Sequence, residues 1–166
     1  VRYQCTYSAK VAANDRDSEI SFKIRVPIIT TDSASDPTEK GGLFGQLSIV
    51  TIEVRSKANI FPEDLVDITV KHALSGVYSF LTQEDKIHLI KKIHSESKSS
   101  VVTVDEIKNE LSRINNIDWF TVQCSNFGIL NSYNTFIGTE KQSRAPYYGY
   151  EDWNDLELEL LAGSLQ

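Results

Sequence analysis

The sequence predicts an α+β fold, in which an antiparallel β-sheet carries helices on one of its faces. Apolar and polar residues alternate in three segments between residues 2 and 55, and alternation returns between residues 117 and 139. Between these regions, apolar residues recur at the spacing of three and four that is typical of an amphipathic helix. The order strands, helices, strands is typical of the α+β class.

The opening strands follow from the alternation. Residues 2–11 place Tyr3, Cys5 and Tyr7 on one face, which predicts a half-buried strand. A polar turn at 14–17 and renewed alternation over 20–28 predict a hairpin. A third strand is expected over 46–55, after a long loop from residue 31 to residue 45 that is the natural place to look for a site.

Three helices are expected next. The first begins at Pro62, and its apolar stripe predicts that it runs on to Leu81. The second follows Thr82 and spans about residues 83–94, and the third starts at Thr103, where Glu106 completes a capping box. The stripe of the first helix consists of Val70, Ala73, Leu74, Val77, Tyr78 and Leu81.

Two closing strands, over 117–125 and 133–139, complete a module that spans residues 1–139. The acidic, aromatic tail over 140–166 differs in character and includes an alternating segment at 156–160 that could add an edge strand. We leave two interpretations of the tail open: a segment that docks on another chain, or a tail packed on its own domain.

Composition narrows the classes of function. The 166 residues and an apolar fraction of 40% suit one compact domain. A formal net charge of -6 disfavours nucleic acid as a partner. No apolar run approaches the ~20 residues that span a bilayer, and no signal-peptide pattern opens the chain, so we expect a cytoplasmic protein without a membrane partner.

Two further features of the composition carry expectations. Cys5 and Cys124 are far apart and form no CxxC pair, so we expect two free, partly buried thiols. The chain contains no methionine and begins within a strand pattern, which suggests a fragment of a longer protein.

A search by residue type finds few candidate sites. The three histidines, His72, His88 and His94, share no metal-ligand spacing, and we interpret them as solvated or as lying at the edge of the core. The sequence contains no P-loop, GxGxxG or GxSxG motif. The carboxylates of the long loop could bind a hard cation, although loops of this composition are usually solvated.

Three segments together resemble one known family. Residues 26–35 read VPIITTDSAS and residues 42–48 read GLFGQLS, similar to VPVTTLCPCS and GAHNQRS at the same spacing in the type IB GTP cyclohydrolases. Residues 75–86 and 125–134 read SGVYSFLTQEDK and SNFGILNSYN, similar to that family's SPVYxLLKRxDE and ENFESIHNHD. The resemblance implies a tunnelling fold, in which modules of this kind close into a barrel and the sites lie between modules.

The resemblance also implies a metal site that this chain has altered. In the family, the first loop cysteine and the loop histidine bind a divalent metal that activates water for attack on the purine ring of GTP. These positions are Asp32 and Phe44 here, and only Asp32 could still bind a metal. The glutamate of the family's DE pair becomes Lys86, which places a cation near the position of the metal.

The proton-transferring positions are altered as well. The inner glutamate of the last motif becomes Gly128, and its two histidines become Asn131 and Tyr133. The positions expected to line the altered pocket are Asp32, Ser33, Phe44, Gln46, Lys86, Gly128, Asn131 and Tyr133.

These replacements lead us to expect no catalytic residue, no metal and no cofactor. The expected function is a non-enzymatic binding or assembly module, paired with itself or with a paralogous tunnelling-fold subunit, that retains a purine or pterin pocket. Two alternatives stay open. One is an enzyme whose repurposed chemistry uses Asp32, Ser33 and Lys86, and the other is a GTP cyclohydrolase whose site a partner chain completes.

Overall fold

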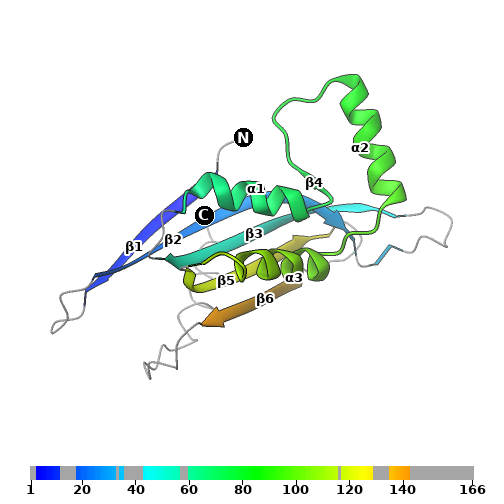
Figure 1. Cartoon of the computed structure of the whole chain (residues 1–166). Coiled ribbons are helices and arrows are strands. Elements are labelled where there is room, and N and C mark those ends of the chain that lie inside the picture. The colour runs from blue at the N-terminus through cyan, green and yellow to red at the C-terminus, as the bar shows by residue number, and fades with distance from the viewer. Residues whose placement is uncertain are drawn as a thin grey trace, which may run out of the picture.

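The described residues form one antiparallel sheet with helices on one side, which confirms the predicted α+β class (Figure 1). The computed structural model describes residues 3–11, 18–32, 34–35, 43–56, 60–115, 117–128 and 135–142. Two helices, α1 and α3, lie over the sheet, and α2 extends beyond its end. No helix in these ranges combines the length and the hydropathy that a membrane-spanning segment requires.

The sheet has the strand order β1-β2-β3-β5-β6, and the short strand β4 pairs with β2 beside this series. All described pairings are antiparallel. The strands are β1 (Gln4–Val11), β2 (Ser18–Thr31), β3 (Gly45–Ser56), β4 (Ser75–Gly76), β5 (Ile117–Phe127) and β6 (Thr135–Gln142). The predicted strands therefore all exist, and their ends differ from the predicted ends by a few residues.

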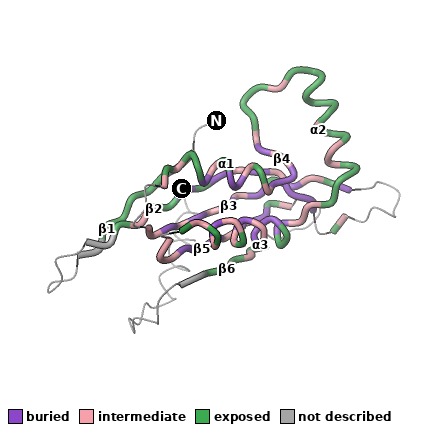
Figure 2. Tube along the Cα trace, in the orientation of Figure 1, coloured by how far each residue is buried: buried purple, intermediate pink, exposed green. Residues whose placement is uncertain are grey.

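The core lies between the central strands and the two covering helices, as the buried segments in Figure 2 show. Alternate residues of β2, β3 and β5 point to this side and are fully buried, as the alternation predicted. Ile24, Ile52 and Val122 are register partners across the three strands. The core residues from α1 (Pro62–His72) and α3 (Ser100–Leu111) are Leu65, Ile68, Val104, Ile107 and Leu111.

The first helix is shorter than predicted. It ends at His72, and the chain continues in an extended conformation from Ala73 into β4. The physical reason for this early end is that part of β2 has no backbone partner in β1. Strand β1 pairs with β2 only as far as Arg25, so the backbone of Ile28 and Ile29 needs another partner, which residues 75–76 provide. The residues predicted to form one helical stripe are therefore divided between α1 and the extended segment that follows it.

The third helix begins earlier than predicted. Ser99 caps it by accepting a hydrogen bond from the amide of Val102 at 3.4 Å, so the helix starts at Ser100 and not at Thr103. Thr103 is instead buried inside the helix, where its hydroxyl donates to the carbonyl of His72 at 3.3 Å. In the sequence Thr103 resembled an N-cap, but in the structure it joins α3 to α1.

Helix α2 (Gln83–Ser95) begins where the sequence predicted. Thr82 and Asp85 form a reciprocal capping box at its start. None of its residues is buried, and its apolar residues Ile87 and Ile90 are 46% and 55% exposed. The helix is therefore stabilised by its cap and its own hydrogen bonds more than by packing on this domain.

Strand β1 is exposed on both faces, so the prediction of a half-buried strand is wrong. Tyr7 is 66% exposed, and every residue from Tyr3 to Ala9 is classed with the surface. Within the described residues β1 is an edge strand that pairs with β2 alone. The core cluster does not include it, and its side chains face the start of α1 only across a concavity.

An ionic cluster joins α1 to α3 and should make stability depend on pH. Glu110 accepts hydrogen bonds from Lys71 Nζ at 2.8 Å and from His72 Nε2 at 2.5 Å. These bonds, first that of Lys71 and then that of His72, hold the pKa of Glu110 below its usual 4.5. Because the folded-state pKa is lowered, the stabilisation is present above pH 4.5 and is lost as pH falls through the folded pKa.

We therefore expect Glu110→Gln to lower the free energy of unfolding by about 1 kcal/mol at pH 7, as measured by urea denaturation. The deficit should shrink as the pH falls below 4.5 and through the lowered folded-state pKa, because the wild-type carboxyl then becomes neutral as well. A deficit that does not change with pH would contradict this assignment.

Candidate functional site

The candidate site lies at one end of the sheet, where β2 and β5 end and β3 begins. Thr31 at the end of β2 pairs with Gly45 at the start of β3, and Leu47 pairs with Phe127 at the end of β5. The antiparallel order thereby brings together segments that are far apart in the sequence. Asp32, Gln46 and Gly128, three of the predicted site residues, meet here.

Asp32 is held rigidly by its own loop and is only 1% exposed. Its amide donates to the carbonyl of Phe44 at 2.8 Å, and its carbonyl accepts from Ser35 Oγ at 2.6 Å. Its Oδ1 accepts from the amide of Ala34 at 2.9 Å. The other carboxylate oxygen, Oδ2, is buried and has no hydrogen-bond partner among the described residues.

The unpartnered oxygen faces the backbone of Gly128. A Cβ atom built on Gly128 would lie 3.1 Å from Asp32 Oδ2 and 3.3 Å from Gln46 Oε1. Gln46 is 6% exposed, and its Nε2 donates to the carbonyl of Thr31 at 3.2 Å, which fixes the direction of its amide. Two acceptor oxygens therefore converge next to a residue without a side chain, and such a pair suits N–H donors.

A buried polar network supports this end of the sheet. Asn126 Oδ1 accepts from Ser48 Oγ at 2.9 Å, while Nδ2 donates to Ser100 Oγ at 2.9 Å and to Thr135 Oγ1 at 2.8 Å. Thr30 Oγ1 lies 2.7 Å from Ser48 Oγ and extends the network into β2. One amide thus joins β3, β5, β6 and α3, which keeps the strand ends in register.

This network was not predicted from the sequence. The position of these residues in the alternating pattern could have revealed it. Thr30, Ser48 and Asn126 lie on the buried face of their strands, where the other alternating residues are apolar. A polar residue at a buried strand position needs a partner, so three of them predict a network.

Two predicted site residues direct their side chains elsewhere, although the backbone of Phe44 bonds to Asp32. Phe44 is 36% exposed, and its ring makes an edge-to-face contact with His94 of α2, with centroids 6.5 Å apart. Lys86 is exposed in the first turn of α2. It lies about 10 Å along the helix axis from Ile93, the residue that packs near Gly45. Ser33, Asn131 and Tyr133 lie outside the described residues, as do the tail from residue 143 and its alternating segment.

A divalent metal does not fit the side chains that the structure describes at this end of the sheet. The described residues contain no group of three histidine, cysteine, aspartate or glutamate side chains that could hold one. Phe44 has no lone pair to donate, and Asp32 Oδ2 is a single oxygen ligand. The donor set implied by the family resemblance is therefore not present in these residues.

The two thiols differ in accessibility, and Cys5 is exposed where the sequence predicted partial burial. Cys124 is buried beside the network, and burial raises its pKa to about 11. We expect one thiol of the folded protein to react within seconds with an aromatic disulfide reagent at pH 8, and the second only in denaturant. Cys5→Ser should abolish the fast reaction, and a fast reaction that remains would contradict this placement.

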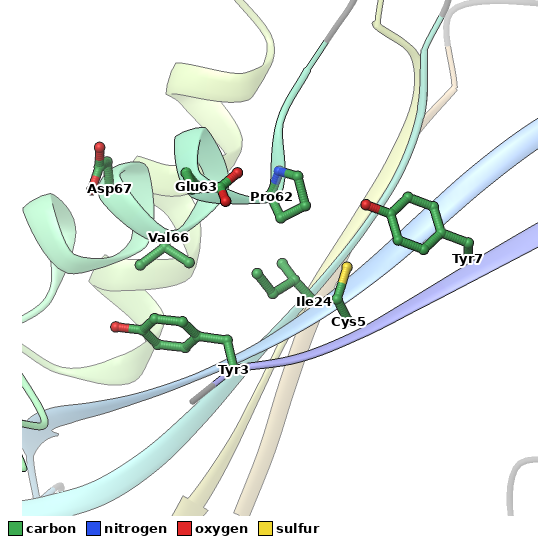
Figure 3. Close-up of a pocket in the computed structure, with 8 residues that line it drawn as sticks. All are labelled: Tyr3, Cys5, Tyr7, Ile24, Pro62, Glu63, Val66 and Asp67. Carbon is green, nitrogen blue, oxygen red and sulfur yellow. The ribbon is translucent and has the colours of Figure 1, made fainter. Parts of the chain in front are cut away.

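A concavity of about 360 Å³ lies between β1 and the start of α1, away from the sheet end (Figure 3). Apolar and aromatic side chains form most of its wall, and two carboxylates of α1 lie on one side. Its lining residues are Tyr3, Cys5, Tyr7, Ile24, Pro62, Glu63, Val66 and Asp67. It includes none of the predicted site residues, so the sheet end and this cavity are alternative locations for a ligand.

Comparison with known proteins gives a consistent result. The family model described as type I GTP cyclohydrolase FolE2 matches residues 1–136. A protein named GTP cyclohydrolase FolE2 from Geobacter sp. (strain M21) is 30% identical over 141 residues, covering 85% of this chain and 52% of that protein. The protein of the same name from Dictyoglomus thermophilum is 31% identical over 131 residues, covering 75% and 51%.

A further FolE2, from Geotalea uraniireducens (strain Rf4), is 27% identical over 144 residues and covers 87% of this chain and 52% of that protein. The chain thus spans about half the length of the curated relatives it matches.

These findings correct one expectation and confirm another. The expected function as a non-enzymatic binding or assembly module is wrong, because the relatives that match most of the chain are named as GTP cyclohydrolases. The replacement of single motif residues had been taken as evidence against an enzyme, and the names of the relatives contradict that interpretation. The sheet with helices on one side is the tunnelling fold that the resemblance implied, and the chain belongs to the type I GTP cyclohydrolase FolE2 family.

Proposed function

We propose that this chain is part of a hydrolase of the GTP cyclohydrolase type, and that a purine nucleotide binds at the sheet end formed by Asp32, Gln46 and Gly128. The observation that carries the proposal is the buried Asp32 Oδ2 beside Gly128, which has no hydrogen-bond partner among the described residues. The names of the relatives support the reaction class.

The geometry suits a base that presents N–H groups. An ionised carboxylate is an acceptor only, and Gln46 offers its Oε1 at the same place. Guanine presents N–H donors on one edge, so its base could satisfy both oxygens. The carboxylate can also accept a proton from bound substrate or water, which is the role of a general base.

A further module is proposed to complete the site. This chain covers about half of each relative, and the exposed edge strand β1 and the unburied helix α2 offer surfaces for association. We propose that a second copy, a paralogous tunnelling-fold subunit or another segment of a longer chain supplies the remaining wall. The groups that the motif comparison finds replaced, at positions such as Phe44, would then come from that module.

Phe44 supports a second candidate, an altered hydrolysis of a purine or a pterin-like compound. In this version the chemistry uses Asp32 and does not depend on a metal bound at position 44. A substrate panel separates the two candidates, because the second predicts turnover of a pterin or of another purine without consumption of GTP.

The test uses the native assembly, isolated through a tag on this chain from the cells that make it. Its mass is measured, and consumption of GTP, ATP and a pterin is followed by chromatography. We expect loss of GTP but not of ATP, and a loss of about 100-fold in rate with Asp32→Asn, which removes the acceptor at constant shape. An assembly that consumes neither GTP nor a pterin would contradict the proposal.

A further inference from the structure

We infer that helix α2 of this chain packs antiparallel against α2 of a second copy, through a face centred on Ile87 and Ile90. Whether a nucleotide binds at the sheet end does not affect this pairing. The starting observation is that α2 extends beyond the end of the sheet and has no buried residue, as Figures 1 and 2 show. Such a helix is accessible to another molecule along most of its surface.

The apolar stripe of α2 is wider than its own domain covers. Successive residues of a helix are turned by about 100°, so residues three and four apart share a face. Leu89 and Ile93 are partly buried, and Ile93 is the residue that packs near Gly45. Ile87 and Ile90 lie on the neighbouring face and are exposed. The outer half of the stripe is therefore free to pack on a partner.

The charges along α2 make this face complementary to itself. The first turn carries Glu84 and Asp85, whereas Lys92 and His94 lie in the last turn and Lys91 lies just before it. In an antiparallel pair, the acidic start of each helix meets the basic end of the other, and the two-fold symmetry makes this contact twice. A parallel pair would instead bring like charges together.

Glu84 and Lys91 are placed to form these contacts. Lys91 is turned by about 70° and Glu84 by about 90° from the line between Ile87 and Ile90, in the same direction. Both side chains are exposed, and neither makes an ion pair with a described residue. Charged residues that flank an apolar seam in this way pair across helix–helix contacts. Glu84 would thus meet Lys91 of the second copy, while Ile87 packs on its Ile90.

The size of the contact predicts a reversible association. With 13 residues, α2 is about 20 Å long, and a helix pair of this length buries less than the ~1,200 Å² of a stable specific interface. Association through α2 should therefore depend on protein concentration. The contact of His94 with Phe44 places the last turn of α2 beside the candidate site, so the second copy would come close to that site.

The test measures the mass of the full chain by sedimentation at increasing concentration. We expect the wild-type mass to double. Ile90→Asp should weaken the association about 100-fold, because the two-fold symmetry removes two isoleucines from the seam. Glu84→Lys or Lys91→Glu should weaken it about tenfold, since each turns two attractive contacts into repulsive ones. The melting temperature should change little, because α2 gives no residue to the core.

An exchange of charges distinguishes the antiparallel pair from other contacts. The double variant Glu84→Lys with Lys91→Glu restores both contacts between identical chains, and an equimolar mixture of the two single variants restores them between different chains. Both should recover most of the lost association. The matched control is Lys92→Glu, the same change on the next residue, which lies about 170° from the isoleucine seam. It should leave the association unchanged.

Several outcomes would overturn the pairing. They are a wild type that stays monomeric at the highest concentration, single variants that associate as strongly as wild type, or exchanged charges that fail to restore association. The acidic tail is the other candidate for this face. If removal of residues 143–166 shifted the amide signals of Ile87 and Ile90 without a change in mass, the face would belong to the tail and the pairing would be wrong. None of these measurements involves GTP, so they leave the proposed function to its own test.

Discussion

Asn126→Ala is expected to lower the free energy of unfolding by about 4 kcal/mol, because it leaves several buried hydroxyl groups without partners. The Asn126 amide bonds to Ser48, Ser100 and Thr135, and both serines are 4% exposed or less. Each buried group that loses its partner keeps its desolvation penalty, and truncation adds a cavity. Chemical denaturation monitored by tryptophan fluorescence measures the loss.

A surface asparagine provides the control for this prediction. Asn109 donates to Asp105 Oδ2 at 3.1 Å on the exposed face of α3, and Asn109→Ala should change stability by no more than about 0.5 kcal/mol. If Asn126→Ala were as mild as this control, the network would not hold the strand ends together.

Phe120→Ala is expected to destabilise the protein by a similar amount, about 4 kcal/mol. Phe120 is 1% exposed and is among the largest fully buried side chains of the described core. It lies on β5 in register with Val54 of β3. Its removal leaves a cavity that the surrounding strands and helix can fill only in part, and the same denaturation experiment reports the effect.

The matched control is Phe136→Ala on the edge strand β6, where the side chain is 64% exposed. Its effect should stay below about 1 kcal/mol. Equal effects at positions 120 and 136 would contradict the assignment of the core to the face that α1 and α3 cover.

The strands were predictable because the alternation of apolar and polar residues is a local pattern of the sequence. The alternation around Ile24, Ile52 and Val122 records which side of the sheet is covered, and that pattern survives in the sequence without knowledge of partners. The start of α2 was predictable for the same reason, since Thr82 and Asp85 form a cap within four residues.

The errors arose where a distant partner decides local structure. Helix α1 stops at His72 because β2 needs a backbone partner at Ile28, and no local pattern records this need. The alternation in β1 resembled that of a half-buried strand, although none of its residues joins the core. Tertiary pairing overrides local propensity in both cases.

The candidate site was partly predictable. The motif comparison identified Asp32, Gln46 and Gly128, and the sheet register places them together. It also led to the expectation of a non-enzymatic module, which the names of the relatives contradict. The sequence could not reveal that the Asp32 carboxylate points at Gly128, because this depends on the geometry of three strand ends.

The central claim is that a purine nucleotide binds at the Asp32 end of the sheet, and the most direct measurement is an NMR titration of the chain with GTP. The account predicts that the amide signals of Ala34, Gln46 and Gly128 shift, while those of Cys5 and Val66 in the cavity of Figure 3 stay unchanged. Shifts confined to Cys5 and Val66, with Gly128 unmoved, would contradict it.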